Sequence, residues 1–262
     1  MRRASARALT NSDPRASVVT LAPLLHDSVR AVRLEAVELL AGAPPHVLSP
    51  GVSPKLDAAI AEYIASQELN ADRPESHMNL GLLDEKERHF DVAEGEFKGA
   101  LSLDPTFAPA AVDLADLYRE ENRDQDGERV LRDTIDRSPN DAALQHALGL
   151  SMIRQKRAAQ ALDYLGAAAR LAPDNARYPY VYAVALNDLG QTKTAIERLE
   201  SIVSAHPYDR DSLLALIAFL RQSGNATKAL DYAQRLQELE PASPQVEQTI
   251  KTLNEEIRAK AE

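Results

Sequence analysis

The side chains that could hold a metal ion or attack a substrate are scattered along this sequence. No pair of its six histidines has the H-E-x-x-H spacing or another spacing typical of metal ligands. They are His26, His46, His77, His89, His146 and His206. The chain has no cysteine, which excludes thiolate nucleophiles, disulfides and cysteine-attached haems. We therefore expect no metal site and no cofactor.

Paired carboxylates are the remaining candidates for acid–base chemistry. Asp124 with Asp126 and Glu255 with Glu256 fall in predicted turns or on exposed helix faces rather than in a cleft. The sequence also lacks a phosphate-binding loop, a dinucleotide-binding turn and a serine-nucleophile elbow. A catalytic group needs a positioned partner, and none is visible. The pattern predicts a protein that is not an enzyme.

The composition of the chain argues against two classes of partner, nucleic acids and the membrane interior. The 262 residues include 30 Lys and Arg against 40 Asp and Glu, a formal net charge of −10, which argues against binding of nucleic acid. The apolar stretches are too short to span a bilayer, so we expect no membrane insertion. The basic residues at the N-terminus are followed by polar ones, not by the apolar core of a signal peptide. A cytoplasmic location is expected.

The elements that position these side chains follow a 34-residue period. Prolines recur at this spacing, and small residues precede each of them by twelve residues. The prolines are Pro105, Pro139, Pro173, Pro207 and Pro241, and the small residues are Ala93, Gly127, Ala161, Ala195 and Ala229. A further position, 24 residues before each proline, is small in four of the five units, at Gly81, Ala115, Gly149 and Ala183. Such a period is the signature of a repeat protein.

This pattern resembles the tetratricopeptide repeat (TPR), a helix–turn–helix unit of 34 residues with small residues at its eighth and twentieth positions. The resemblance implies an all-α fold, a right-handed α-solenoid of helix hairpins. Five units are expected, at residues 74–107, 108–141, 142–175, 176–209 and 210–243. Large apolar residues at the seventh and twenty-fourth positions, such as Leu148 and Leu165, would fill the space between units.

Two residues depart from the pattern. Asp84 stands where TPR units have a large apolar residue, and a buried carboxylate there needs a partner, for which Arg88 is one turn away. Gly127 stands where the pattern has alanine inside a helix, and glycine there destabilises the helix by about 1 kcal/mol relative to alanine. The array should hold, because its stability is a sum over neighbouring units.

The segments outside the five units have their own predicted roles. Residues 54–73 and 244–262 are expected to be capping helices, each beginning with a Ser-Pro pair. Residues 43–53 contain three prolines and are expected to be a linker. Residues 1–42 resemble a HEAT repeat, through the Leu24-Leu25 pair, the Asp27 turn and the Val29-Arg30 start of an Ala/Leu-rich helix. The resemblance implies helices near residues 16–25 and 29–41.

The TPR resemblance also implies a binding surface, because the first helix of each unit lines the concave groove. The fifth and ninth positions are mostly apolar, and arginines or an asparagine lie near the rim. The predicted groove residues are Met78, Leu82, Val112, Asp116, Arg119, His146, Leu150, Arg154, Tyr180, Val184, Asn187, Leu214 and Arg221. Because Lys and Asn are missing from the fifth and ninth positions, a chaperone-type carboxylate clamp is disfavoured. The alternative is that the apolar members only pack between units.

The expected function is therefore a scaffold that binds a peptide or protein segment in the groove, as an amphipathic helix or an extended apolar segment. The partner's identity is unknown, and self-association through the end helices is a further possibility. The HEAT-like and TPR segments together also resemble the tail of bacterial multihaem c-type cytochromes, which implies an alternative role in a cell-envelope redox or assembly complex. Without cysteine this chain cannot attach a haem. That alternative would make a periplasmic location possible.

Overall fold

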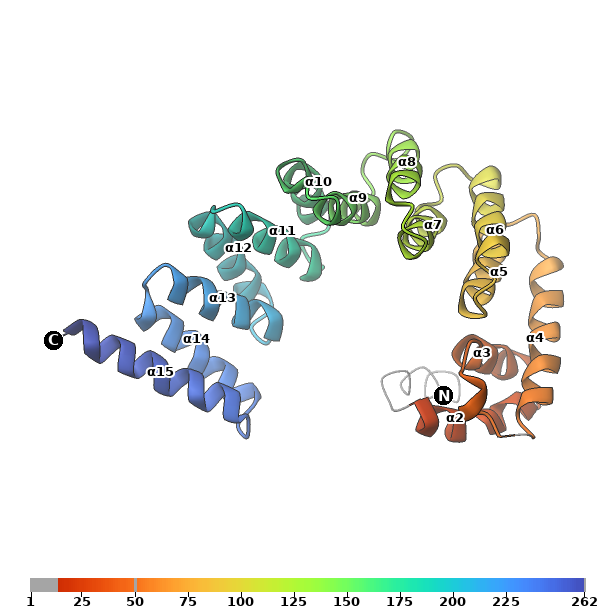
Figure 1. Ribbon diagram of the computed structural model, residues 1–262, viewed down its shortest axis with the longest axis horizontal. Coiled ribbons are helices and arrows are strands. Elements are labelled where there is room, and N and C mark those ends of the chain that lie inside the picture. Colours follow the sequence, from red (N-terminus) through yellow and green to blue (C-terminus); the bar gives the residue numbers. More distant parts are fainter. Residues whose placement is uncertain (1–13, 50, 262) are drawn as a thin grey trace. The chain divides into compact units, whose positions relative to one another are not determined.

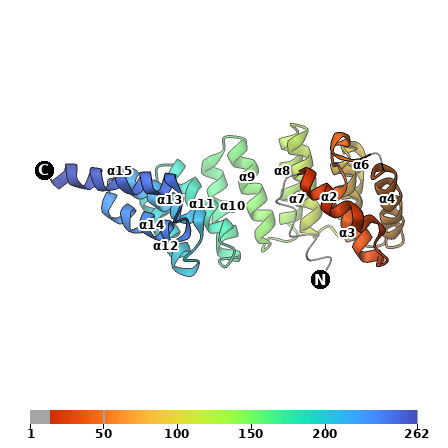
Figure 2. The ribbon, with the colours of Figure 1, turned by 90° about the horizontal axis from the view of Figure 1, so that it is seen from below.

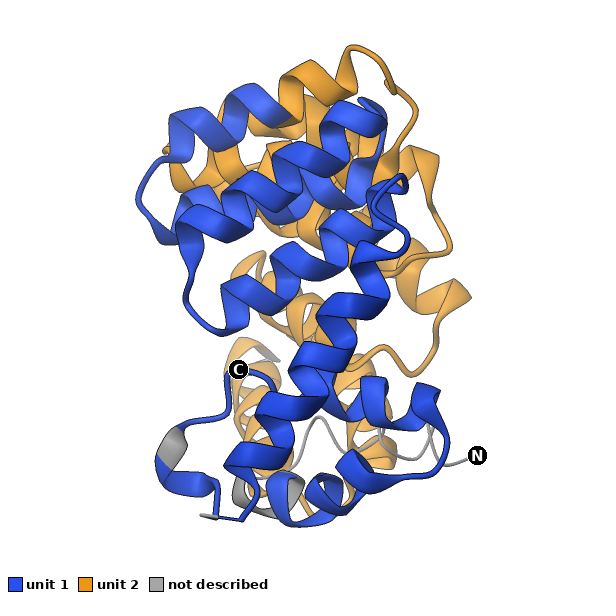
Figure 3. Cartoon of the chain, turned by 90° about the vertical axis from the view of Figure 1, so that its right-hand side faces the viewer, with its two compact units in different colours: residues 1–130 blue, residues 131–262 orange. Residues whose placement is uncertain are grey.

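Helices are the only regular structure in the part of the chain that the structure describes. This computed structural model describes residues 14–49 and 51–261, which contain fourteen α-helices, two 3-10 helices and no strand (Figure 1). The chain divides into two compact units, residues 1–130 and 131–262, and the boundary falls within helix α8 (Figure 3). The predicted all-α fold, a solenoid of helix hairpins, is confirmed.

Unit 1 begins with a small helical head. Its elements are α2 (Pro14–Leu21), the 3-10 helices η1 (Ala22–His26) and η2 (Pro45–Val47), α3 (Arg30–Leu40), α4 (Ser53–Glu68), α5 (Pro74–Lys86), α6 (Phe90–Leu103), α7 (Ala108–Glu120) and the start of α8 (Asp124–Ile135). The first predicted helix of the head is interrupted at Pro23, because proline has no amide hydrogen to continue an α-helix. Residues 1–13, which belong to the predicted HEAT-like segment, lie outside the described residues.

The head and helix α4 share one hydrophobic core. Val37, Leu40, Leu56 and Tyr63 are buried together, and Val47 from the predicted linker packs against them. The guanidinium of Arg33 on α3 donates two hydrogen bonds to the Glu62 carboxylate on α4, at 2.9 and 2.6 Å. Helix α4 therefore packs against α3 as well as against α5. The helix begins one residue earlier than predicted, with Val52 at its N-cap.

Unit 2 consists of consecutive helix hairpins and a final single helix. After the end of α8 come α9 (Ala142–Arg154), α10 (Ala158–Leu171), α11 (Arg177–Asp188), α12 (Thr192–Ala205), α13 (Arg210–Gln222), α14 (Ala226–Leu239) and α15 (Pro244–Ala261). Each hairpin packs on the next through α10 with α11 and α12 with α13, and α15 packs against α14 (Figure 2). Asp141 and Asp209 cap α9 and α13 by accepting backbone N–H bonds, as N-cap carboxylates do.

The turn inside each hairpin repeats the 34-residue period in its backbone. Each of the five 34-residue repeats has one residue with positive φ in this turn, with values from 60° to 79°. These residues are Arg88, Asn122, Lys156, Gly190 and Gly224. The next residue in each unit donates its backbone N–H to a carbonyl five residues earlier, for example His89 to Asp84 at 2.8 Å. Only two units use glycine, which adopts this conformation without steric penalty.

Small residues allow the two helices of a hairpin to approach closely. A Cβ atom on Gly81 would lie 2.6 Å from the Phe97 ring, and one on Gly149 would lie 2.6 Å from the Leu165 side chain. Phe97 and Leu165 are fully buried.

Among the described residues, no helix combines the length and apolar character required to cross a bilayer.

Candidate functional site

The C-terminal end of unit 2 contains an apolar groove. Helices α13, α14 and α15 enclose a cavity of about 500 Å³, which we call the C-terminal groove. Its apolar walls come from all three helices, and they consist of Leu214, Ile217, Ala218, Ala233, Leu236 and Val246. Leu214 is 38% exposed although it is surrounded by core residues, so part of this apolar surface contacts solvent. The volume lies within the range of protein ligand pockets.

Two arginines on α13 line the same groove. Arg210 forms an ion pair with Glu240, and the Arg221 Nε donates to Glu256 Oε1 at 2.7 Å. The hydrogen bond with Glu240 raises the pKa of Arg210 above its usual value. Both guanidinium groups are about half exposed, and exposed ion pairs contribute little free energy. An acidic group on a ligand could therefore exchange with either glutamate.

Contacts of α15 with the α13–α14 turn fix the groove. Lys260 Nζ donates to the carbonyl of Gly224 at 2.7 Å, next to the contact of Arg221 with Glu256. Val246 and Leu253 on α15 are buried in the core that α13 and α14 share. Helix α14 is capped by the Asn225 side chain, which accepts from the Lys228 N–H at 3.2 Å. The three walls are thus held by packing and by polar contacts at the C-terminal end of α15.

Two of the predicted groove residues, Leu214 and Arg221, line this cavity. Sequence reasoning missed Ile217, Leu236 and Val246, because it considered only those positions of the first helix in each repeat that were expected to face the concave groove. The signal for Val246 was present: it belongs to an apolar stripe on the last helix. The sequence predicts this helix as a cap of the last repeat and not as a groove wall.

Some of the predicted groove residues in unit 1 pack against the core, and others are exposed to solvent. Met78 and Leu82 pack against the core of Phe97, Leu114 and Tyr118, and Val112 is half-buried. Asp116 and Arg119 are exposed and form an ion pair with Nε–Oδ1 at 3.2 Å. Close by, burial and the charge of Asp116 raise the pKa of Asp113 to about 6. Burial and the nearby acidic side chains also raise the pKa of Glu85.

The predicted residues on α9 and α11 in unit 2 are mostly half-buried. Tyr180 packs against the core of unit 2, while Leu150 and Val184 are partly exposed. Arg154 is exposed, and Asn187 accepts a hydrogen bond from the Thr192 hydroxyl at 2.9 Å. For Met78 and Leu82 the structure shows the packing role that the sequence left as the alternative, and Tyr180 also packs against a core.

His146 differs from its equivalents because it is a polar side chain inside the core. It is 7% exposed, and neither ring nitrogen has a hydrogen-bond partner within the described residues. Its ring lies 4.7 Å from the Tyr178 ring, between centroids. Burial, assisted by the charge of Arg177, lowers the pKa of His146 to about 4. The side chain is therefore a neutral packing residue at pH 7 and is closed to a ligand.

A second cavity, of about 340 Å³, lies between α10, α11 and α12. Gly166 and Tyr182 line it, and Arg170 and Arg198 bring two positive charges to its edge. No predicted groove residue belongs to it. We describe this cavity as the α10–α12 cavity.

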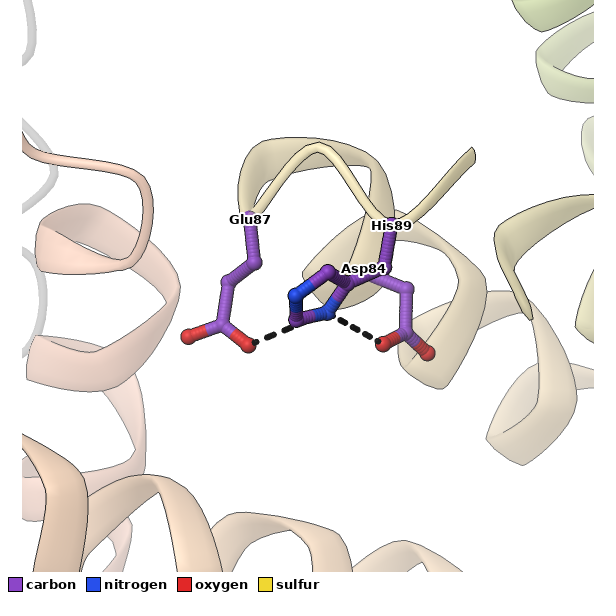
Figure 4. Close-up of side chains that lie close together, drawn as sticks. All are labelled: Asp84, Glu87 and His89. Carbon is purple, nitrogen blue, oxygen red and sulfur yellow. Dashed lines mark ion pairs between the residues drawn. The ribbon is translucent and has the colours of Figure 1, made fainter. Parts of the chain in front are cut away.

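The turn between α5 and α6 brings together three side chains that could ligate a metal ion (Figure 4). His89 Nδ1 lies 3.5 Å from Asp84 Oδ1 and 3.9 Å from Glu87 Oε2. Asp84 is half-buried, and its pKa is raised by burial, while His89 opposes the shift. The ion partner of Asp84 is thus His89 and not Arg88, whose guanidinium lies over the Phe90 ring.

Family comparison identifies the repeats. Models of the tetratricopeptide repeat match residues 85–150, 146–209 and 183–245, which together extend over more than half of the chain. A search of curated proteins found no match.

Solved structures show the same fold. YrrB, described as a TPR protein with an unusual peptide-binding site, is 17% identical, with a TM-score of 0.55 over 71% of this chain and 96% of its own. MamA is 21% identical, with a TM-score of 0.55 over 64% and 92%. PilF of Pseudomonas aeruginosa is 19% identical, with a TM-score of 0.56 over 87% and 99%. At these identities the likeness concerns the fold, and with the family matches it leads to one conclusion: the chain belongs to the tetratricopeptide repeat family.

Proposed function

We propose that this protein is a non-enzymatic interaction scaffold that binds a peptide or protein segment in the C-terminal groove. The observation that carries the proposal is a solvent-accessible apolar cavity of about 500 Å³, which is also lined by an arginine from each end of α13. TPR repeats and the likeness to TPR structures support the general class of protein binding. This volume lies within the range of pockets that bind ligands through apolar walls.

The chemistry of the walls favours an amphipathic segment. An apolar face with side chains at a spacing of three and four residues would contact Leu214, Ile217 and Val246. Acidic side chains beside that face would pair with Arg210 or Arg221, because their present partners are exposed and exchangeable. The predicted residues Leu150 and Val184, on α9 and α11, would extend the contact along unit 2.

The test is a substitution at Leu214 in the full chain. A peptide-display library is selected against the wild-type protein, and the affinity of the selected peptides is measured by fluorescence polarisation. Leu214→Glu places a carboxylate on the apolar wall, and we expect at least about a tenfold loss of affinity, since binding would desolvate this carboxylate against the apolar face of the peptide. Leu214 is the better choice than Tyr180, because Tyr180 packs against the core and its replacement would also affect folding.

A matched control separates groove binding from a general surface effect. Leu189 is 39% exposed, nearly equal to the 38% of Leu214, and lies in the α11–α12 turn away from the groove. Leu189→Glu should leave the affinity unchanged, and circular dichroism should show equal helicity for both variants. Equal binding by wild type and Leu214→Glu would exclude the C-terminal groove. Loss of binding on replacing Arg170 and Arg198 would instead place the ligand in the α10–α12 cavity.

The domain boundaries, the HEAT-like assignment of the head and the cytoplasmic location stay predictions. The alternative of an accessory module for a cell-envelope redox or assembly complex rests on the sequence resemblance to multihaem cytochromes. Fractionation of the native cells decides between the two settings, because a periplasmic protein would favour the alternative. Light scattering over a range of concentrations tests self-association through the end helices.

A further inference from the structure

The turn between α5 and α6 arranges one histidine and two carboxylates around a common point. Asp84 lies near the end of α5, Glu87 follows the helix, and His89 precedes α6 (Figure 4). One ligand atom from each of these residues lies within 4.8 Å of the other two. The sequence predicted no metal site, because the D-x-x-E-x-H spacing is not a familiar ligand motif and the turn alone brings these atoms together.

The distances fit coordination better than direct hydrogen bonding. His89 Nδ1 is 3.5 Å from Asp84 Oδ1 and 3.9 Å from Glu87 Oε2, both longer than a normal hydrogen bond. Ligands held about 2.1 Å from a tetrahedral metal ion are separated from one another by about 3.4 Å. Small rotations of these exposed or half-buried side chains would therefore place all three ligand atoms around one ion.

The repeat pattern supplies an independent observation. In the other four 34-residue repeats, the residues equivalent to Asp84 are apolar or aromatic and are buried. They are Tyr118, Met152, Leu186 and Leu220. The residues equivalent to His89 are Arg123, Arg157, Gln191 and Asn225. Among the five repeats, only the first, residues 74–107, thus carries both a carboxylate at the position of Asp84 and a histidine at the position of His89. The carboxylate that departs from the repeat pattern therefore occurs together with the one histidine at the other position, and these two residues face each other across the turn.

The local charge favours a cation. Asp84 is half-buried, and a carboxylate in such a position is unfavourable unless a positive charge compensates it. Glu96 on α6 is close enough to interact electrostatically with Asp84, and it forms its own ion pair with His77 at 2.7 Å. A divalent ion would neutralise Asp84 and Glu87 together, and it would link the end of α5 to the start of α6.

We propose that the α5–α6 turn binds one divalent transition-metal ion of the zinc class through Asp84, Glu87 and His89, with water completing the coordination. The imidazole ligand selects Zn²⁺ and its neighbours over Mg²⁺ and Ca²⁺, which prefer oxygen ligands. This site is separate from the C-terminal groove and does not depend on the function proposed for it. Its expected role is to stabilise the first hairpin.

The test is a titration of the full, tag-free chain with Co²⁺, followed in the visible absorption bands of the bound ion, and with Zn²⁺ by calorimetry. We expect one ion per chain. His89→Asn and Asp84→Leu should each weaken binding at least about tenfold, since changes outside the ligand shell already weaken metal sites 10- to 100-fold. Asn and Leu occur at the equivalent positions of other units, so both variants should fold.

Two further measurements make the outcome decisive. Zn²⁺ should raise the melting temperature of the wild type and leave that of Asp84→Leu unchanged. His26→Ala, a change at an exposed histidine on the head, should bind the ion as the wild type does. The proposal is overturned if the wild type shows no saturable binding below millimolar ion. It is equally overturned if His89→Asn binds Co²⁺ as tightly as the wild type.

Discussion

Replacing His146 with valine should make the stability of the protein less sensitive to acid. The ring is buried beside Tyr178, and neither of its nitrogens has a hydrogen-bond partner in the described part of the chain. Burial lowers the pKa of His146 from 6.5 to about 4. Below pH 6.5 the His146 side chain becomes protonated in the unfolded chain, whereas in the folded chain it stays neutral until about pH 4. The free energy of unfolding therefore decreases as the pH falls.

The magnitude follows from the size of the shift. Each pKa unit corresponds to 1.36 kcal/mol, so this single group should lower the free energy of unfolding by about 2 kcal/mol at pH 5 and about 3 kcal/mol near pH 4. Valine occupies the equivalent position of the preceding unit, at Val112, and it has no group that titrates. His146→Val should also remove two buried polar atoms that lack partners, which at pH 7 offsets the packing lost beside Tyr178.

The assay is urea unfolding of both proteins at pH 7, 6, 5 and 4.5, followed by circular dichroism. The difference in stability between variant and wild type should move toward the variant by about 2 kcal/mol between pH 7 and pH 5. Proton NMR of the His146 ring gives the pKa directly. A difference that stays constant over this range, or a measured pKa near 6.5, would refute the claim that the ring is buried without partners.

Four further substitutions test the packing and the charges of the repeats. The Glu94 carboxylate accepts hydrogen bonds from Arg123, Lys98 and Tyr118, which lower its pKa to about 2, so Glu94→Gln should destabilise the protein by about 2 kcal/mol at pH 7. This loss should shrink as the pH falls from 4.5 toward 2, and a loss independent of pH would contradict it. Asp113→Asn should stabilise by about 1–2 kcal/mol at pH 7, because the folded state raises the pKa of Asp113 to about 6, and the gain should vanish below about pH 4. Gly95→Ala should stabilise by up to about 1 kcal/mol, because nothing lies within 4 Å of the new Cβ, whereas Gly149→Ala should destabilise through its contact at 2.6 Å with Leu165. Equal changes in the free energy of unfolding for the two alanine variants, measured in urea, would contradict the claim that a Cβ atom at position 149 clashes with Leu165.

The hairpins could be predicted from the sequence because the signals that begin and end a helix are local. A proline follows the second helix of each hairpin, and Asp141 and Asp209 cap the helices that they precede. Small residues recur where the two helices of most hairpins approach each other. The left-handed turn residues also recur every 34 residues, from Arg88 to Gly224. These features depend on residues a few positions apart, so the period alone determined the helices, their pairing and the family.

The binding surface was decided by tertiary structure. Leu214 and Tyr180 occupy the same position in their repeats, yet Leu214 borders an open groove whereas Tyr180 is half-buried and packs against the core. The groove exists because α15 contributes Val246 as its third wall, and the metal-ligand group exists because the α5–α6 turn folds His89 back onto Asp84. Periodicity determines which face of a helix a side chain occupies, whereas the elements packed against that face determine whether solvent or a ligand can reach it.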